Sequence, residues 1–176
     1  MSSIHCTAEE TRKLHQLLKL NGSSQLATIS CFLCNARSLN NKIDLIVELL
    51  NDNQVDFAFI TETWFSQESN AITSIIKQAG YEIEHVYRSK KGAGVAILWK
   101  SNFKVKCNFK RKSYETFQFT NVEICGTVKI NVICIYRLQE TSPAEFMLEL
   151  DHLLSRYISK SDTIVLTGIL ILQSQN

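Results

Sequence analysis

The sequence predicts a single layered domain of the mixed α/β or α+β class, in which helices pack on the faces of β-sheets. The chain has 176 residues, which is the usual length of one domain. Hydrophobic residues make up 45% of the chain and charged residues 20%, as in ordinary globular proteins. Segments with helical spacing of apolar residues alternate with short β-favouring runs, in the order β-α-β-α, several strands, then α-β.

The N-terminal residues 1–25 are expected to lie apart from this domain, which we place at residues 26–176. Thr7 and Glu10 have the spacing of a capping box, and leucines follow on one helical face. A short helix is therefore predicted over residues 7–20. The sequence GSSQ, which comes next, has the composition of a linker.

Local patterns predict each element of the domain in turn. Ser38 can cap a helix whose apolar residues begin at Ile43 and have the i, i+3, i+4, i+7 spacing. A second helix over residues 69–79 ends at Gly80, and a third begins at Pro143. Runs of β-branched and aromatic residues predict strands at residues 26–33, 57–61, 81–88, 95–99, 103–109, 115–125, 129–136 and 163–168.

Basic residues are clustered, although the net charge is only +2. They are Arg88, Lys90 and Lys91, followed by Lys100, Lys104, Lys106, Lys110, Arg111 and Lys112. A basic strip of this kind suits the phosphate backbone of a nucleic acid. It is equally consistent with a solvated hairpin edge whose lysines oppose aggregation. Both interpretations stay open at this stage.

The six cysteines favour a reducing, intracellular setting over a disulfide-linked or zinc-binding one. Cys31 and Cys34 have the spacing of a zinc or redox pair, but no second pair or histidine cluster completes it. On a strand, positions three apart face opposite sides. We therefore expect Cys31, Cys125 and Cys134 to be buried apolar residues with no disulfide partner.

The sequence also predicts that the protein has no membrane partner. Its first residues, MSSIHCTAEETRK, are polar and lack the apolar core of a signal peptide. No apolar run approaches the length of a membrane span. An intracellular location is expected, and the nucleus is one such location.

Polar residues that follow predicted strands are the candidates for a functional site. Asn35 follows the first strand and Glu62 follows the apolar strand FAFIT, so the two converge if these strands are neighbours. A carboxylate and an amide oxygen together suit a hard cation such as Mg²⁺. Tyr136 and Arg137 follow the run INVICI, where a phenol and a guanidinium can hold a phosphate. The alternatives are a helix cap or solvated acid at Glu62, and aromatic packing beside an exposed arginine.

Taken in order, several short stretches carry a family resemblance. They are NARSLNNK, TETW, KKGAGVAI, IYR and TIVLTG, and the resemblance covers residues 29–168. The series resembles the endonuclease domain of non-LTR retrotransposons, a branch of the endonuclease/exonuclease/phosphatase superfamily, which also includes abasic-site DNA repair nucleases. The resemblance implies a four-layered α/β sandwich of two mixed β-sheets flanked by helices. It also implies Mg²⁺-dependent hydrolysis of DNA phosphodiester bonds.

The same resemblance implies roles for individual residues. Asn35 matches the active-site asparagine, and Glu62 matches the metal-binding glutamate. Tyr136 matches the tyrosine that contacts the scissile phosphate, with Arg137 beside it. The family usually continues with prolines, whereas this chain has LQ at the next two positions. The loop that follows is therefore expected to differ.

The chain departs from the family pattern after Gly168. The resemblance implies Gly-Asp-x-Asn at this point, but Ile169, Leu170 and Ile171 follow instead. The family's later aspartate and Ser-Asp-His motif are also missing. We therefore expect a truncated sandwich, incomplete at the C-terminus, that binds Mg²⁺ weakly and is catalytically inactive. The alternative is a non-catalytic nucleic-acid-binding remnant that uses the basic strip around residues 100–112.

Overall fold

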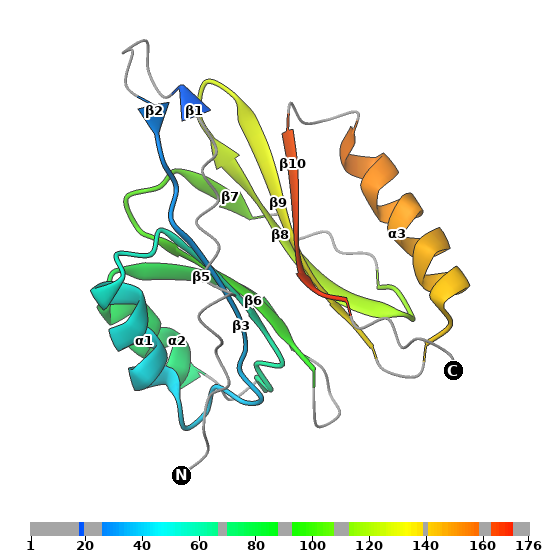
Figure 1. The fold of residues 1–176 in the computed structure, drawn as a ribbon. Coiled ribbons are helices and arrows are strands. Elements are labelled where there is room, and N and C mark those ends of the chain that lie inside the picture. The colour runs from blue at the N-terminus through cyan, green and yellow to red at the C-terminus, as the bar shows by residue number, and fades with distance from the viewer. Residues whose placement is uncertain are drawn as a thin grey trace.

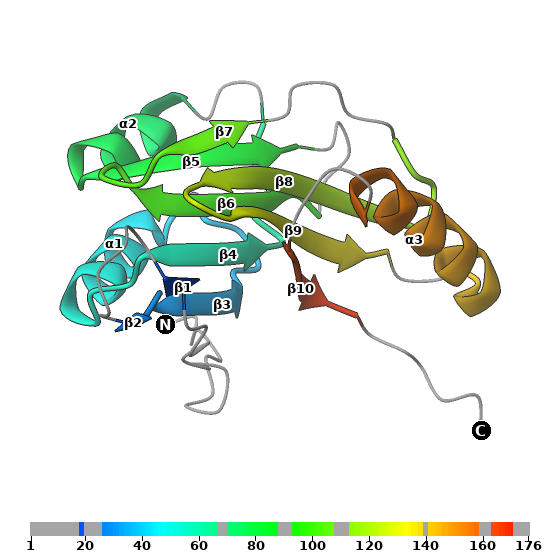
Figure 2. The same cartoon turned by 90° about the horizontal axis from the view of Figure 1, so that it is seen from above.

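Two β-sheets lie face to face in the computed structural model, with helices on their outer sides (Figures 1 and 2). The structure describes residues 18–19, 26–66, 70–87, 93–107, 113–138, 141–158 and 163–170. Each of the two sheets has four strands and contains both parallel and antiparallel neighbours. This arrangement confirms the expected sandwich of two mixed β-sheets flanked by helices.

The first sheet has the strand order β3-β4-β6-β5. Its strands are β3 (Cys31–Asn35), β4 (Phe57–Thr61), β5 (Tyr81–Val86) and β6 (Val95–Lys100). β3 runs parallel to β4, whereas β6 is antiparallel to both β4 and β5. Every residue of β4 is buried, because helices cover one face of the sheet and the second sheet covers the other. This burial explains why the sequence FAFIT is apolar at successive positions rather than alternating.

Helices α1 (Ile43–Asp52) and α2 (Asn70–Gln78) cover the outer face of this sheet (Figure 1). Their buried residues follow helical spacing and are Ile43, Ile46 and Leu50 in α1 and Ile72 and Ile76 in α2. α2 is followed by Gly80, whose φ of 85° is in the left-handed region that commonly ends helices. The predicted end of this helix is therefore confirmed.

The predicted role of Ser38 as a helix cap is wrong. α1 begins at Ile43 after Lys42, and no side chain caps its first turn. Ser38 instead has a φ of 82°, and its backbone N–H donates to the Glu62 carbonyl oxygen at 2.8 Å. A hydrogen bond to a distant segment holds this loop, so the local capping preference does not decide where the helix starts.

The second sheet has the strand order β10-β9-β8-β7. Its strands are β7 (Val105–Cys107), β8 (Phe117–Cys125), β9 (Lys129–Arg137) and β10 (Thr163–Ile169). β8 and β9 form a long antiparallel pair, and β10 lies parallel to β9 at the edge of the sheet. Helix α3 (Pro143–Ile158) lies between β9 and β10 in the chain, as a parallel crossover requires. Within the described ranges, no helix is both long and apolar enough to cross a lipid bilayer.

A short antiparallel pair, β1 (Leu18–Lys19) and β2 (Leu26–Ala27), precedes the first sheet. It corrects the helix predicted over residues 7–20, because β1 is extended. The rest of that helix and the GSSQ segment lie outside the described residues. The strand predicted over residues 26–33 is also divided, since residues 28–30 separate β2 from β3. Pairing of β1 with β2 supplies backbone hydrogen bonds that a helix would otherwise make.

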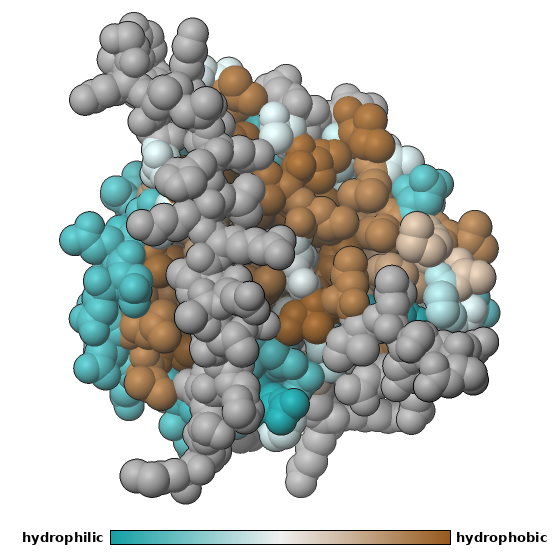
Figure 3. All heavy atoms as spheres, in the orientation of Figure 1, coloured by the Kyte–Doolittle hydropathy of each residue, from teal (hydrophilic) through white to brown (hydrophobic). Residues whose placement is uncertain are grey.

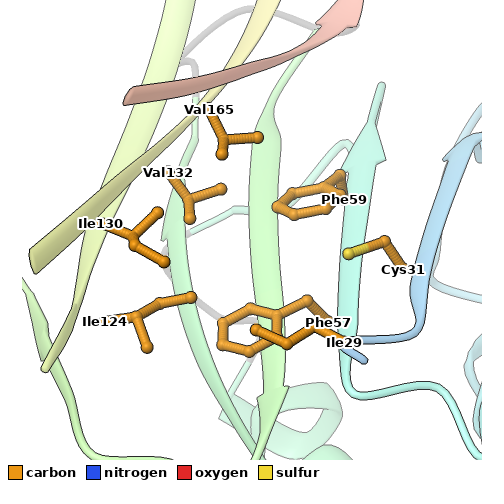
Figure 4. A pocket seen from close by; sticks show the side chains of 8 residues that line it. All are labelled: Ile29, Cys31, Phe57, Phe59, Ile124, Ile130, Val132 and Val165. Atoms are coloured by element: carbon orange, nitrogen blue, oxygen red, sulfur yellow. The ribbon is translucent and has the colours of Figure 1, made fainter. Parts of the chain in front are cut away.

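An apolar core fills the space between the two sheets. Eight side chains line a cavity of ≈ 30 Å³ within it (Figure 4), namely Ile29, Cys31, Phe57, Phe59, Ile124, Ile130, Val132 and Val165. Such a lining offers a water molecule almost no hydrogen-bonding partner, which favours a dry cavity. On the face shown in Figure 3, apolar side chains reach the surface across the middle of the molecule.

Candidate functional site

One carboxylate oxygen joins three of the residues that the sequence singled out. Glu62 Oε1 accepts a hydrogen bond from Asn35 Nδ2 at 2.9 Å and another from the Tyr136 hydroxyl at 2.9 Å. Asn35 ends β3 in the first sheet, and Glu62 comes directly after β4. Tyr136 belongs to β9 in the second sheet. The three side chains therefore connect the two sheets at one end of the sandwich.

Strand register explains why these residues meet. β3 and β4 are parallel and Asn35 lies opposite Thr61, so both strands end at the same edge of the first sheet. Asn35 is on the same side of β3 as Cys31, which packs in the core between the sheets. Tyr136 is part of that same core, and only 6% of its surface is exposed. Side chains from both sheets thus point into the same space.

The backbone around Glu62 adopts an unusual concentration of left-handed conformations. Six described residues other than glycine have positive φ, and five of them are Arg37, Ser38, Glu62, Trp64 and Ala93. Hydrogen bonds join their three loops side by side, because Ser38 N donates to the Glu62 carbonyl oxygen and Trp64 N donates to the Ala93 carbonyl oxygen. Each such residue costs on the order of 1 kcal/mol or more. Strain of this kind is typical of functional sites, where the surrounding structure holds it in place.

Burial and the neighbouring Glu62 carboxylate both favour the neutral form of the Tyr136 phenol. Burial raises the pKa of Tyr136 to about 12, with further contributions from its hydrogen bond to Glu62 and from the Glu62 charge. The Arg37 guanidinium acts in the opposite direction on this pKa. At physiological pH the hydroxyl therefore keeps its proton and serves as a hydrogen-bond donor.

A second contact between the sheets lies beside this cluster. The Gly94 N–H donates to Gln118 Oε1 at 2.7 Å. Gln118 lies on β8 directly opposite Tyr136, so the contact braces the strand that carries the tyrosine. Sequence reasoning identified the glycine turn KKGAGVAI but missed Gln118, since nothing near this glutamine in the sequence indicates a partner in the other sheet.

The structure does not bring Arg137 to the cluster. Adjacent residues of a strand face opposite sides of the sheet, so Arg137 lies on the α3 side while Tyr136 faces the interior. Arg137 is buried, donates to the Thr141 carbonyl oxygen at 2.5 Å and lies 5.3 Å from the centre of the Phe146 ring. Its position is that of a residue that anchors the loop before α3.

Among the described members of the basic strip, Lys104 and Lys106 lie at the other end of the second sheet, whereas Lys100 ends β6 in the first sheet and forms a 3.0 Å ion pair with Asp56. Lys104 and Lys106 are exposed, and Lys106 forms a 3.8 Å ion pair with Glu123. Glu123 lies opposite Asn131, five residues along β9 from Tyr136. At about 3.3 Å per residue the two ends are roughly 17 Å apart. The remaining predicted members, Lys110, Arg111 and Lys112, lie outside the described residues, as do Arg88, Lys90 and Lys91.

The end of β10 lacks the polar residue that the resemblance implies. Ile169 lies opposite Tyr136 in the parallel pairing of β10 with β9, and it packs against the core between the sheets. The residue implied at this position is an aspartate, whose carboxylate would lie on the same side as the tyrosine. Gly168 has a φ of 137°, and β9 passes so close that a Cβ there would overlap the Ile135 carbonyl oxygen. The strand and its glycine are therefore present, while the carboxylate is replaced by an aliphatic side chain.

The donor atoms at the cluster suit Mg²⁺ only in part. Glu62 supplies one carboxylate, a ligand of the type that Mg²⁺ prefers, whereas the Asn35 amide turns its nitrogen towards this carboxylate and its oxygen towards Arg37 N. Among the described residues, no group of three or more histidine, cysteine, aspartate or glutamate side chains could hold a metal ion. Mg²⁺ commonly binds to one or two carboxylates together with water and substrate phosphate. The residues therefore fit an ion that a phosphate helps to hold.

Cysteines do not offer a competing metal site in the first sheet. Cys34 packs under the helices and Cys31 packs against the core on the opposite face, so the two thiols cannot bind one ion. Burial also raises the pKa of the Cys31 thiol to about 11, with a smaller contribution from Asp56. A raised pKa disfavours the thiolate, which is the form of cysteine that binds a metal ion.

Two further residues near Glu62 were not predicted as functional. Arg37 and Trp64 are both exposed, and both have left-handed backbone conformations. Arg37 N donates to Asn35 Oδ1 at 3.3 Å, which ties the arginine to the cluster. Both residues were visible in the stretches NARSL and TETW, but their exposure depends on how the loops are folded.

Comparison with known proteins agrees with the fold. The model described as "Endonuclease/Exonuclease/phosphatase family" matches residues 21–168. No curated protein matches the sequence.

Solved structures with a similar fold include the endonuclease domain of TRAS1, a telomere-specific non-LTR retrotransposon. It is 11% identical with a TM-score of 0.61, and the match covers 82% of this chain and 61% of that one. A 3′ phosphatase from Neisseria, NExo, solved with a product DNA hairpin, is 19% identical with a TM-score of 0.57, covering 78% and 56%.

An AP endonuclease from Archaeoglobus fulgidus is 20% identical with a TM-score of 0.55, covering 80% of this chain and 56% of that one. The chain thus spans less than two thirds of the length of each of these structures. At such low identities these structures support the fold alone, and the family match over most of the sequence decides membership. The chain belongs to the Endonuclease/Exonuclease/phosphatase family.

Proposed function

We propose that this chain binds a DNA phosphate together with Mg²⁺ at Glu62, Asn35 and Tyr136, and that it does not hydrolyse the phosphodiester bond. The observation that carries the proposal is the shared carboxylate oxygen, 2.9 Å from both Asn35 Nδ2 and the Tyr136 hydroxyl. It supports a preformed site at the end of two sheets. We assign the chain to the retrotransposon branch of the family because of its NARSL and TETW stretches.

Each side chain has a distinct task in this proposal. The Glu62 carboxylate would hold the ion, which when bound supplies positive charge beside the phosphate oxygens, and the Asn35 amide nitrogen holds that carboxylate in place. Tyr136 is protonated at neutral pH, since its pKa is about 12. Its hydroxyl can therefore donate a hydrogen bond to a phosphate oxygen in place of the one to Glu62. Arg137 has no part in the site, since it lies under α3.

The expected lack of hydrolysis follows from position 169. A positioned general acid or base contributes typically 10²–10⁴-fold to the rate, and electrostatic stabilisation of developing charge is often the largest contribution. An isoleucine side chain can neither accept a proton nor stabilise charge. Ile171, where the resemblance implies an asparagine, lies outside the described residues but is equally apolar.

Two measurements test the proposal. In the first, supercoiled plasmid is incubated with the protein and Mg²⁺, and no nicking above background is expected. Nicking that disappears in Glu62→Ala would show that the chain is an active nuclease.

In the second, fluorescence anisotropy measures the affinity for a labelled oligonucleotide with Mg²⁺ and with EDTA. Glu62→Gln should abolish the Mg²⁺-dependent part of binding, whereas Glu82→Gln, at a solvent-accessible carboxylate on β5, should leave it unchanged. An identical response to Mg²⁺ in the wild type and in Glu62→Gln would disprove the site.

A second candidate function is DNA binding through the basic strip. It is favoured by the exposure of Lys104 and Lys106, whose ion pair with Glu123 is weak because it is solvated. A double charge reversal, Lys104→Glu with Lys106→Glu, separates this candidate from the first. If the strip binds DNA, the variant has lower affinity without Mg²⁺. The slope of log affinity against log salt should then fall by about 0.9 for each phosphate that the protein no longer neutralises.

A further inference from the structure

The two tryptophans of the chain have opposite environments. Trp99 lies in the core between the sheets and is 5% exposed, whereas Trp64 is 44% exposed. An indole with this exposure is available to a ligand, because burying it against one would stabilise the complex. Trp64 comes two residues after Glu62 of the proposed phosphate site.

The backbone holds Trp64 in place firmly. Its φ is 55°, a conformation that is uncommon for a bulky residue, and its N–H donates to the Ala93 carbonyl oxygen at 3.0 Å. The preceding residue, Thr63, is bonded through its N–H to the Gly94 carbonyl oxygen and through its carbonyl oxygen to Leu39. The indole is therefore carried by a segment that is joined to loops on both sides.

Arg37 occupies the loop on the other side of Glu62. The segments around residues 37–39 and 62–64 lie side by side, because Ser38 N and Leu39 N donate to the carbonyl oxygens of Glu62 and Thr63. Lys42 Nζ donates to the carbonyl oxygens of Ala36 and Arg37, which steadies the loop that carries the guanidinium. One loop thus carries an exposed cation whose charge acts on Tyr136, and the adjoining segment carries an exposed indole.

These two groups complement different parts of a nucleotide. A guanidinium forms charge-assisted hydrogen bonds with phosphate oxygens. An indole stacks on the face of a base without regard to sequence. A base inside a continuous duplex already has neighbours on both faces, so it cannot stack on a side chain unless it leaves the helix.

We propose that Arg37 and Trp64 form a nucleotide-binding subsite that selects single-stranded or unpaired DNA, with Arg37 on a phosphate and Trp64 stacked on a neighbouring base. This inference rests on the proposed function, since it names the form of DNA that the Glu62 site accepts. It also assigns to Arg37 the phosphate contact that Arg137 is not placed to make.

The test compares a single-stranded oligodeoxythymidylate with a duplex of the same length, at low salt and with Mg²⁺. Intrinsic fluorescence reports on stacking, because Trp99 is buried in the core and only Trp64 is accessible to a base. We expect the single strand to bind at least about tenfold more tightly than the duplex and to quench the fluorescence. Trp64→Leu should abolish the quenching and lower single-strand affinity about tenfold.

Arg37→Ala should weaken the binding of single strand and duplex alike, and it should reduce the slope of log affinity against log salt by about one. Leu148→Gln and Lys77→Ala are the matched controls, since they alter an exposed apolar residue on α3 and an exposed lysine on α2. Circular dichroism melts of all variants ensure that each one is folded.

The possible results separate the two proposals. If neither oligonucleotide binds by anisotropy, the proposed function is wrong and the subsite falls with it. If binding depends on Mg²⁺ and on Glu62 but is equal for single strand and duplex, only the subsite is wrong. Quenching that survives in Trp64→Leu would also overturn the subsite alone.

Discussion

Two parallel strand pairs end at the same place in this molecule, and they end differently. The pair β3–β4 ends in Asn35 and Glu62, whose side chains are hydrogen bonded at 2.9 Å. The pair β9–β10 ends in Tyr136 and Ile169, which lie opposite each other in the strand register. The first pair contributes a carboxylate and an amide, whereas the second contributes one hydroxyl and a hydrocarbon.

The difference shows that the framework and the chemistry of a strand end depend on different atoms. Backbone pairing holds β10 beside β9 along the whole strand, from Thr163 opposite Ile130 to Ile169 opposite Tyr136. That pairing does not depend on the side chain at position 169. The two pairs also differ in burial, because β4 is buried throughout while β10 is partly exposed and Leu166 reaches 39%.

The largest effect is expected from a substitution that disrupts the β9–β10 pair. A Cβ at Gly168 would overlap the Ile135 carbonyl oxygen, so β10 must shift to accept it. Gly168→Ala should lower the free energy of unfolding by about 3 kcal/mol or more, measured by chemical denaturation. Gly80→Ala is the matched control: its φ is also positive, but nothing lies within 4 Å of the added Cβ, so about 1 kcal/mol is expected. Equal destabilisation of the two variants would contradict the close approach of β9.

The next largest effect is expected from a substitution that makes the two strand ends more alike. Ile169→Asp adds a carboxylate on the side of Tyr136, and a second carboxylate should raise the affinity for Mg²⁺ about tenfold in isothermal titration calorimetry. The variant should be less stable than the wild type without the ion, because a charge replaces a packed aliphatic group, and Mg²⁺ should restore part of its Tm. Ile169→Asn is the uncharged control, and the same Mg²⁺ affinity in both variants would refute this prediction.

A smaller effect concerns the hydrogen bond that joins the two pairs. The pKa of Tyr136 is raised from an ordinary value of 10.0 to about 12, so the folded state holds the phenolic proton more tightly than the unfolded state does. The contribution of the protonated Tyr136 to the free energy of unfolding is complete below pH 10 and is lost as the pH rises towards about 12. Tyr136→Phe should remove this part of the pH dependence.

The contribution of Glu62 to the raised pKa of Tyr136 can be measured separately. Glu62→Gln removes the negative charge, so the pKa of Tyr136 should move towards its ordinary value while burial keeps it above. Absorbance of the phenolate, taken as the difference between each protein and its Tyr136→Phe counterpart, reports this titration. An unchanged titration in Glu62→Gln would mean that the carboxylate does not act on the tyrosine.

The smallest effect is expected far from both strand ends. Lys106→Ala removes a 3.8 Å ion pair with Glu123 in which the lysine side chain is 68% exposed. Exposed pairs of this kind contribute about 0.5 kcal/mol or less, so thermal unfolding should hardly change. The Mg²⁺-dependent DNA binding assigned to Glu62 should also be preserved, and its loss would move the site to the basic strip.

Local patterns predicted much of the fold, and they failed where distant contacts intervened. The strand FAFIT and the helix beginning at Pro143 have the predicted bounds at those positions, since burial on both faces and a proline at the first turn are properties of adjacent residues. The helix cap predicted at Ser38 was wrong because the backbone N–H of this residue bonds to the Glu62 carbonyl oxygen in another loop. The helix predicted over residues 7–20 was wrong at β1 because β1 pairs with β2, which lies beyond the predicted linker.

The candidate site was predictable in its residues but not in its geometry. Asn35, Glu62 and Tyr136 were identified from strand ends and from a family resemblance, and their convergence depends on the register of two sheets. Arg137 could have been placed correctly by the alternation of strand residues, which turns it away from Tyr136. Arg37 and Trp64 were missed because exposure is a property of folded loops rather than of short sequence stretches.

By itself, the sequence determined the residue types that each strand end can offer. A strand that ends in Gly168 and Ile169 has no carboxylate there in any conformation, so the sequence alone decides that this group is missing. Only the tertiary structure decided which groups meet: Glu62 and Tyr136 are 74 residues apart, yet they share a hydrogen bond. Periodicity is a local property of the chain, whereas register and the packing of one sheet on another depend on contacts between distant residues.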